Sequence, residues 1–216
     1  MNILDLFFPK RCVGCGKIGK YFCLACQKGI RFVATNELIC PMCGRAALDG
    51  ITHPGCQTRY SIDGLTSFFH YDGIIKKAVK SLKYRFVSNL ADEFISLVSF
   101  PSLPHGIIIP IPLHPSRLRE RGFNQAEVLG LQLSQKLHIP QRTDILKRVK
   151  KTVPQVNMLK RSDRLKNMEH VFASKIASSD ILLFDDVLTT GATMRGAANV
   201  LKRAGVKRVW AVTMAR

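Results

Sequence analysis

The sequence Ile181-Leu-Leu-Phe-Asp-Asp-Val-Leu-Thr-Thr-Gly-Ala-Thr193 places an apolar run before two acids and a loop of small, hydroxyl-bearing residues. A short apolar run bounded by polar residues is typical of a strand buried on both faces of a parallel sheet. Asp185 and Asp186 follow the run, and side chains at the carboxyl end of such a strand face ligands. The stretch therefore predicts an α/β fold with a ligand site at residues 185–193.

The loop at residues 189–193 has the features of an anion site. It carries no bulky side chain, and Gly191 permits backbone conformations that other residues avoid. Residues 194–204 predict a helix with Ala197, Val200, Leu201 and Ala204 on its apolar stripe, which puts the loop at a helix N-terminus, where an anion is favoured. The two acids can bind hydroxyl groups or a cation, and the adjacent loop can bind an anion. Together they predict a ligand that contains a ribose and a 5-phosphate. The alternative is a pair of solvated acids beside an ordinary helix cap.

This stretch resembles the binding motif of type I phosphoribosyltransferases, which use phosphoribosyl pyrophosphate (PRPP) as ribosyl donor. The resemblance implies that the two acids hold the ribose hydroxyls and that the loop holds the 5-phosphate. The implied PRPP-binding residues are Asp185, Asp186, Thr189, Thr190, Gly191, Ala192 and Thr193. It also implies a parallel sheet flanked by helices, and Mg²⁺ bound together with PRPP.

A second anion loop is predicted after the apolar run at residues 106–113. Pro110 and Pro112 lack the N–H that a strand ladder needs, so the strand must end around them. Arg117 and Arg121 project together if a helix has begun there, and guanidinium groups suit a pyrophosphate. Phosphoribosyltransferases carry a pyrophosphate loop at the corresponding place, which implies that His114, Arg117 and Arg121 bind pyrophosphate.

All seven cysteines lie in residues 12–56, in a pattern typical of zinc knuckles. The candidate ligands are Cys12, Cys15, Cys23, Cys26, Cys40, Cys43, His53 and Cys56. They predict one or two structural zinc ions. A disulfide framework is the alternative, but no secretory signal is recognisable, which favours a reducing compartment. His53 is the weakest ligand and could instead be a loop residue. Sequential and interleaved pairings both satisfy these spacings.

The cysteine-rich segment predicts a domain of its own at residues 1–60, a single or double zinc ribbon whose folding energy comes largely from metal. Residues 61–216 form the predicted α/β domain. Its expected elements are an early strand at 61–72, helices at 73–86, 91–98 and 126–137, and a last strand at 209–214.

The stretch Pro110-Ile-Pro-Leu-His-Pro-Ser-Arg-Leu-Arg-Glu-Arg-Gly-Phe-Asn-Gln125, between the cysteine module and the acid-pair loop, resembles the ComF family of competence-associated proteins, also called GntX-like. The resemblance covers nearly the whole chain. It implies a zinc-ribbon module on a type I phosphoribosyltransferase-like domain, and a role in DNA uptake and natural transformation with the competence machinery as partner. The chain departs from many such sequences in closing its second ribbon with His53 and Cys56 instead of a cysteine pair.

The net charge of +18, from 33 Lys and Arg against 15 Asp and Glu, favours anionic partners. In the phosphoribosyltransferase fold that the chain resembles, the place of the basic segment 142–170 is taken by a flexible flap that closes over the ribosyl donor. The segment is also a candidate for nucleic-acid binding or an ordinary solvated loop. Lys76, Lys80 and Lys83 form a basic helix face. The aromatic residues Phe22, Phe32, Tyr84 and Phe86 are candidates for base stacking or, with preference, for core packing.

Two functions are consistent with these features. In the first, the protein binds PRPP with Mg²⁺ and also binds single-stranded DNA. In the alternative, it is an active phosphoribosyltransferase on an unidentified small-molecule acceptor, with no DNA role. Purine-using relatives place an acidic base where this chain has Thr189, so no base is obvious for the second function. No apolar run approaches the roughly 18 residues of a membrane span, and we expect a cytoplasmic protein.

Overall fold

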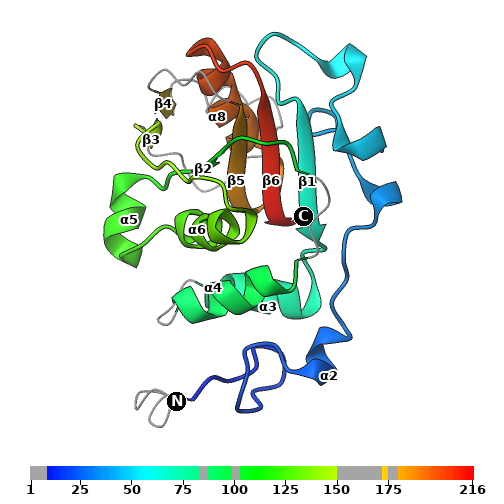
Figure 1. Cartoon of the computed structure of the whole chain (residues 1–216), viewed down its shortest axis with the longest axis vertical. Helices are drawn as coiled ribbons and strands as arrows, with labels where there is room; N and C mark the ends of the chain where they lie inside the picture. Colours follow the sequence, from blue (N-terminus) through cyan, green and yellow to red (C-terminus); the bar gives the residue numbers. More distant parts are fainter. Residues whose placement is uncertain (1–8, 83–86, 99–102, 150–171, 175–179) are drawn as a thin grey trace, which may run out of the picture.

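The computed structural model of the chain describes residues 9–82, 87–98, 103–149, 172–174 and 180–216. Its centre is a parallel four-stranded sheet with the order β1-β6-β5-β2 (Figure 1). The strands are β1 (Gly64–Phe69), β2 (Ile107–Pro110), β5 (Ile181–Val187) and β6 (Val209–Ala215). Strand β5 lies between β2 and β6 and is covered on both faces, which explains why residues 181–184 are continuously apolar.

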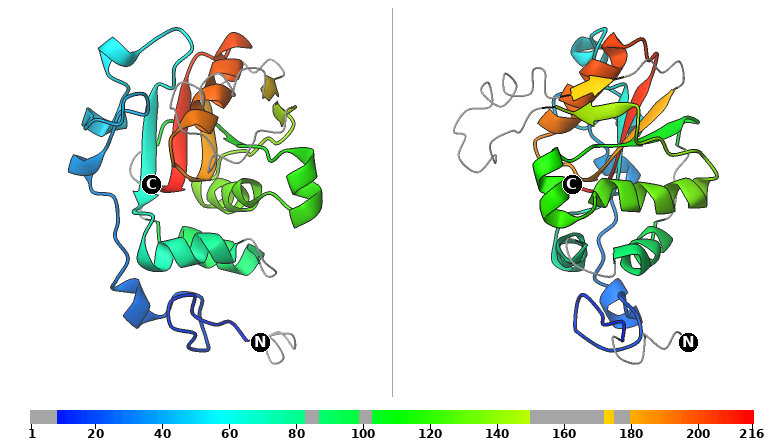
Figure 2. Two further views of the ribbon diagram at one scale, coloured as in Figure 1. Left: turned by 180° about the vertical axis from the view of Figure 1, so that it is seen from behind. Right: turned by 90° about the vertical axis from the view of Figure 1, so that its left-hand side faces the viewer.

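Helices cover both faces of this sheet (Figure 2). The helices of the α/β domain are α3 (Gly73–Ser81), α4 (Val87–Ser96), α5 (Pro115–Arg121), α6 (Gln125–Leu137) and α8 (Ala192–Arg203). One face carries α3, α4 and α6, and the other carries α8 with a short antiparallel pair, β3 (Leu146–Arg148) and β4 (Phe172–Ser174). The predicted fold class, a parallel sheet flanked by helices and preceded by a small cysteine-rich module, is confirmed.

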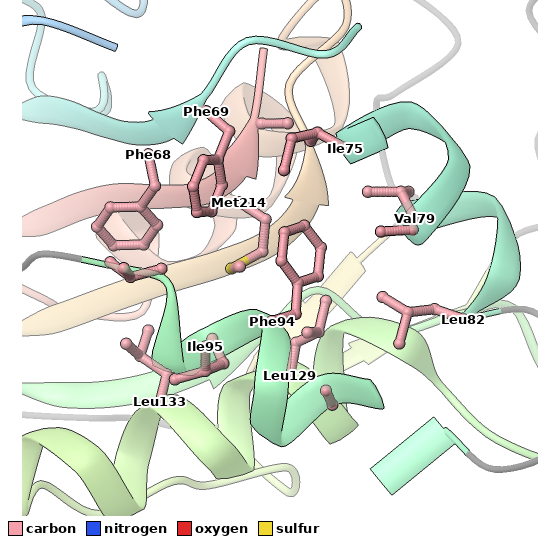
Figure 3. Close-up of a cluster of buried hydrophobic side chains, with 14 of the residues drawn as sticks. Phe68, Phe69, Ile75, Val79, Leu82, Phe94, Ile95, Leu129, Leu133 and Met214 are labelled. Atoms are coloured by element: carbon pink, nitrogen blue, oxygen red, sulfur yellow. The ribbon is translucent and has the colours of Figure 1, made fainter. Parts of the chain in front are cut away.

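A cluster of buried hydrophobic side chains, with several phenylalanines among them, fills the space between the sheet and helices α3, α4 and α6 (Figure 3). Phe69 at the end of β1 stacks on Phe94 of α4 with ring centroids 5.5 Å apart. Phe22 of the cysteine module also packs against Phe94, with ring centroids 5.5 Å apart. The core therefore continues from the sheet through α4 into the cysteine module.

Several elements differ in detail from the sequence-based expectation. Helix α4 begins at Val87 and ends at Ser96, where residues 91–98 were predicted. The buried face of α8 consists of Ala192, Met194, Ala197, Ala198 and Leu201, so Val200 and Ala204 are less buried than predicted. Strand β1, which was predicted within residues 61–72, spans Gly64–Phe69 and is buried throughout. The cysteine module and its connector cover part of this strand: Phe32 and Ile51 bridge to its two ends.

The N-terminal segment spans the whole length of the molecule (Figures 1 and 2). Its first part, with α2 (Leu24–Gln27), lies beyond the α3–α4 layer. The chain then runs along the outside of β1 through the short 3-10 helices η1 (Thr35–Glu37), η2 (Leu48–Gly50) and η3 (Pro54–Cys56). The two halves of the cysteine-rich segment therefore contact different parts of the α/β domain.

Two expectations lie wholly or partly outside the described residues. The basic segment 142–170 is described only to residue 149, and Lys83, Tyr84 and Phe86 are not described. Strands β3 and β4 flank residues 150–171 on both sides. Among the described residues, no helix is both long enough and apolar enough to cross a membrane.

Candidate metal centres and ligand site

The eight predicted metal ligands come together in two groups of four. The groups are Cys12, Cys15, Cys23 and Cys26, and Cys40, Cys43, His53 and Cys56; within each, the ligand atoms all lie within 4.8 Å of one another. The Sγ atoms of Cys15 and Cys23 are 3.7 Å apart, and Cys43 Sγ is 3.4 Å from His53 Nδ1. A tetrahedral zinc with Zn–S bonds of about 2.3 Å separates its sulfurs by roughly 3.8 Å. Both groups therefore fit a structural zinc ion.

The geometry also decides between the alternatives that the spacing left open. Each group takes consecutive ligands along the chain, so the pairing is sequential and not interleaved. All seven cysteines are free thiols. We call residues 9–30 the first ribbon and residues 38–58 the second ribbon.

The surroundings of the second group are those of a metal site. The other ring nitrogen of His53, Nε2, lies 2.9 Å from the carbonyl oxygen of Ala46, the kind of contact that orients a ligating imidazole. The backbone N–H of Arg45, together with its side chain, lowers the pKa of Cys43 to about 6. Backbone N–H groups that bend toward sulfur stabilise the thiolate that metal binding needs.

The first ribbon is attached to helix α4 through Glu93. Its Oε2 accepts hydrogen bonds from the backbone N–H groups of Tyr21 at 2.8 Å and Phe22 at 3.3 Å. Its other oxygen lies 3.6 Å from Lys10 Nζ. Lys77 of α3 donates to the carbonyl of Gly14 at 3.1 Å. The side chains of Glu93, Lys77 and Phe22 thus hold the first ribbon against the α3–α4 layer.

The second ribbon is attached at the start of strand β1. Thr52 N donates to the carbonyl of Asp63 at 2.9 Å, and its hydroxyl donates to the carbonyl of Ile62 at 2.5 Å. Gly50 has a φ of 71° and lies so close to the carbonyl of Leu65 that no side chain would fit. This attachment is made mainly by backbone groups, unlike that of the first ribbon.

The predicted anion loop connects β5 to α8. Gly191 caps the helix with a φ of 69°, a conformation that favours glycine, and Ala192 N lies 3.4 Å from Thr190 Oγ1. Arg195, in the first turn of α8, donates from Nη2 to the carbonyl of Thr190 at 2.8 Å. The loop is therefore held in place from the helix side, at a twelve-residue helix N-terminus.

The two acids lie side by side at the carboxyl end of β5. Asp185 Oδ1 accepts the N–H of Asp186 at 2.9 Å, and Asp186 Oδ1 accepts the N–H of Val187 at 2.8 Å. Burial, and next the neighbouring charge of Asp186, raise the pKa of Asp185 well above its ordinary value. A pair that resists carrying two negative charges is suited to a ligand that donates hydroxyl hydrogens or brings a cation.

The segment after β2 forms helix α5, as the predicted second anion loop requires. The ring of His114 caps this helix: its Nδ1 accepts from Ser116 N at 3.2 Å. Arg117 and Arg121 have different surroundings. Arg121 donates to Gln125 Oε1 at 2.8 Å, whereas Arg117 is close enough to Arg148 for its charge to affect the pKa of that group.

Sequence reasoning missed two residues of this site. Arg148, on β3, has its pKa lowered by burial and by the charge of Arg117, while the charge of Asp185 opposes that shift. Tyr71 follows β1, and its pKa is raised by burial and by the charge of Asp186. Arg148 was not singled out within the basic segment 142–170, and Tyr71 carried no motif. Only the folding of distant strands brings them to the acids.

The candidate DNA-contacting residues have mixed outcomes. Lys76 and Lys80 on α3 are exposed, as predicted. Phe22 is 1% exposed and belongs to the core, which excludes it as a stacking platform. Phe32 is 50% exposed while one face of its ring packs on Phe69, with centroids 5.2 Å apart.

Comparison with known proteins agrees with this architecture. Residues 3–58 match the family model of the double zinc ribbon domain. Competence protein F of Haemophilus influenzae is 30% identical over 232 aligned positions, which cover 97% of this chain and 98% of that protein. Competence protein ComFC of Bacillus subtilis is 31% identical over 85% of this chain and 78% of its own length. DNA utilization protein YhgH of Escherichia coli K12 is 27% identical over 87% of this chain and 86% of its own length.

Among solved structures, the glutamine PRPP amidotransferase of B. subtilis, in complex with ADP and GMP, aligns with 58% of this chain and 25% of its own, at 13% identity and a TM-score of 0.38. That likeness is too low to carry an argument. The observed architecture defines a class of protein, a double zinc ribbon with structural zinc joined to a parallel α/β domain. Within that class, the chain belongs to the ComF family.

Proposed function

We propose that the chain binds PRPP together with Mg²⁺ at the carboxyl ends of β2 and β5. One observation carries this proposal: Arg117 of α5, Arg148 of β3 and Asp185 of β5 come together from three separate elements. Besides burial, the charge of Arg117 lowers the pKa of Arg148 and the charge of Asp185 raises it, and the charge of Arg148 in turn opposes the raised pKa of Asp185. Two like-charged guanidinium groups that approach each other favour an anion between them. A pyrophosphate next to a ribose would meet both kinds of group.

The acid pair suits the ribose and the metal ion. Asp185 and Asp186 each use one carboxylate oxygen for a backbone N–H, which fixes the side chains and leaves the second oxygen of each outside those bonds. Carboxylate oxygens are ligands that Mg²⁺ accepts, usually alongside phosphate oxygens of the ligand. Bound there, Mg²⁺ would neutralise the pyrophosphate. The loop at residues 189–193 would hold the 5-phosphate through the N–H groups at the start of α8.

The test is a titration of the purified protein with PRPP and Mg²⁺ by calorimetry. Replacing both acids (Asp185→Asn with Asp186→Asn) should weaken binding by at least tenfold, and Thr190→Val should weaken it less. Asp180→Asn is the matched control, because Asp180 lies at the opposite end of β5 and pairs with Arg208 at 2.9 Å. Equal affinity in the wild type and the acid-pair variant would refute the site. Pyrophosphate release that requires an acceptor would identify a transferase, and binding without release a binding module.

The same variants separate binding from folding. Because the pKa of Asp185 is raised in the folded state, the folded protein holds its proton to a higher pH than the unfolded chain does. The free energy of unfolding therefore falls as the pH rises from the unfolded pKa through the folded pKa, and stays lower above it. Asp185→Asn removes this loss and keeps the acceptor for Asp186 N. We expect its Tm at pH 7.5 to rise, on the order of 2–4 °C, while PRPP affinity drops.

We further propose that the protein acts in the cytoplasm during DNA uptake and binds single-stranded DNA. Three relatives are named as competence or DNA utilization proteins, which supports the role. The net charge of +18 and the exposed Lys76 and Lys80 support contact with a phosphate backbone, and the exposed face of Phe32 is available for a base. The basic residues of segment 150–171 lie outside the described part of the chain.

Salt dependence tests DNA binding. The logarithm of the affinity for single strands should fall with the logarithm of salt concentration, with a slope of about −0.7 per phosphate contacted. The double replacement Lys76→Ser with Lys80→Ser should flatten the slope by the amount expected for the loss of roughly one to two phosphate contacts. A further flattening should follow when Ser replaces Lys160, Arg161, Arg164 and Lys166. Lys207→Ser, at the far end of the sheet, is the control. No binding at low ionic strength would refute the DNA role and leave the PRPP site unaffected.

A further inference from the structure

The guanidinium group of Arg195 joins two segments that are far apart in sequence. From the first turn of α8 it donates through Nη2 to the carbonyl of Thr190 at 2.8 Å, within the anion loop. Through Nη1 it donates to the carbonyl of Pro41 at 3.2 Å, within the second ribbon. A guanidinium group has several N–H donors in one rigid plane, so a shift of one acceptor displaces the donors that serve the other.

Pro41 lies inside the metal-binding knuckle. It follows the ligand Cys40 and precedes the ligand Cys43 by two residues, and both Cys40 and Pro41 are buried. The knuckle is closed by hydrogen bonds from Gly44 N to the carbonyl of Cys40 and from Cys40 N to the carbonyl of Arg45, both at 2.9 Å. A bound metal fixes the ends of this turn, and its loss releases them, because the folding of such knuckles depends on the metal.

In the anion loop, the acceptor of Arg195 is the carbonyl of Thr190. In a planar trans peptide the C=O and the following N–H point in opposite directions. Arg195 holds the carbonyl of Thr190 and thereby directs the N–H of Gly191 away from itself, toward the side where an anion would be bound. A Cβ on residue 191 would lie 2.8 Å from Arg195 Nη1. Glycine is therefore favoured here for two reasons: its φ of 69° and the close approach of the guanidinium group.

We propose that Arg195 is a positioning residue through which the second zinc cluster organises the anion loop. Zinc at Cys40, Cys43, His53 and Cys56 then favours phosphate binding at residues 189–193, and a bound phosphate favours retention of that zinc by the same factor. The first ribbon, which is bonded to Lys77 and Glu93, has no part in this link. The ligand half of the inference rests on the proposed function, whereas the link between ribbon and loop does not.

Hydrogen exchange of the loop amides at residues 189–193 tests the link without any ligand. Cys43→Ser should reduce the zinc content by one ion and speed exchange of these amides roughly five- to tenfold, the effect of losing about one hydrogen bond. Cys15→Ser, which removes the zinc of the first ribbon, should leave them unchanged. Arg195→Ala should speed the same amides with no loss of zinc, and adding Cys43→Ser to it should have little further effect.

One further control and a separate titration complete the experiment. Arg208→Ala removes the same charge at the opposite end of the sheet and should not change exchange in the loop. Unchanged exchange in Arg195→Ala, or equal effects of Cys43→Ser and Cys15→Ser, would overturn the inference. Titrations with PRPP and Mg²⁺, and with inorganic phosphate, then address the proposed function separately: coupled exchange in a protein that binds neither probe would establish the link and refute the PRPP site.

Discussion

The two zinc ribbons have almost the same ligand spacing but different attachments to the rest of the molecule. The first is held by side chains: Phe22 enters the aromatic core beside Phe94, and Glu93 accepts two of its backbone N–H groups. The second is held mainly by backbone contacts at the start of β1 and by the bridge from Arg195. Metal binding sets the local fold of both ribbons. The part of the α/β domain that each ribbon contacts decides which region the loss of its zinc would affect.

Removal of zinc should have the largest effect. Structural zinc contributes on the order of 10 kcal/mol to the folding of such modules, so chelation should unfold residues 9–58. The sheet from β1 to β6 has its own core on both faces and should remain folded. Zinc analysis with hydrogen exchange measures both outcomes. Metal-free protein with protected amides in the ribbons would contradict the role given to the metal.

The next largest effect should come from the aromatic contact of the first ribbon. Phe22→Ala removes a side chain that is 1% exposed, and such changes cost about 3–5 kcal/mol. Leu24→Ala, two residues away and 74% exposed, should change the free energy of unfolding by less than about 0.5 kcal/mol. Denaturant unfolding compares them. Similar losses in both variants would mean that this ribbon does not share the core.

The polar contact of the same ribbon should matter less. Glu93→Ala leaves the N–H groups of Tyr21 and Phe22 without their acceptor, at a cost of about 1–3 kcal/mol. Glu93→Gln keeps an acceptor oxygen and should cost less. The exposed neighbour Asp92 supplies the control Asp92→Ala. If the Glu93 and Asp92 variants unfold at the same denaturant concentration, the carboxylate does not hold the ribbon.

The smallest effect should come from the connector between the ribbons. Arg31 Nη1 lies 2.8 Å from Asp72 Oδ2, but both side chains are largely exposed, and solvent screens such pairs. Arg31→Ala should therefore cost less than about 1 kcal/mol in thermal unfolding. A larger loss, abolished by high salt, would show that charge as well as packing fixes the connector on the α/β domain.

Much of the architecture was determined locally by the sequence. The apolar run at 181–184 predicted strand β5, and the prolines predicted the end of β2, which stops at Pro110 on the edge of the sheet. The apolar stripes predicted α6 closely, whereas α3 begins at the predicted Gly73 but ends at Ser81, before the predicted residue 86. The paired cysteines predicted zinc, because their chemistry needs only neighbours two or three residues away. These signals depend on residues that are close together in the sequence, so they can be recognised without knowing the fold.

What remained was decided by contacts between distant residues. The sequential pairing of the ribbon ligands, and the place of His53 among them, depend on how residues 40–56 turn in space. Arg148 and Tyr71 reach the acid pair only because β3 and β1 lie where the sheet places them. The bridge from Arg195 to Pro41 spans 154 positions of the chain. No periodicity or spacing records such contacts, because their energy exists only when the packed core brings the partners together.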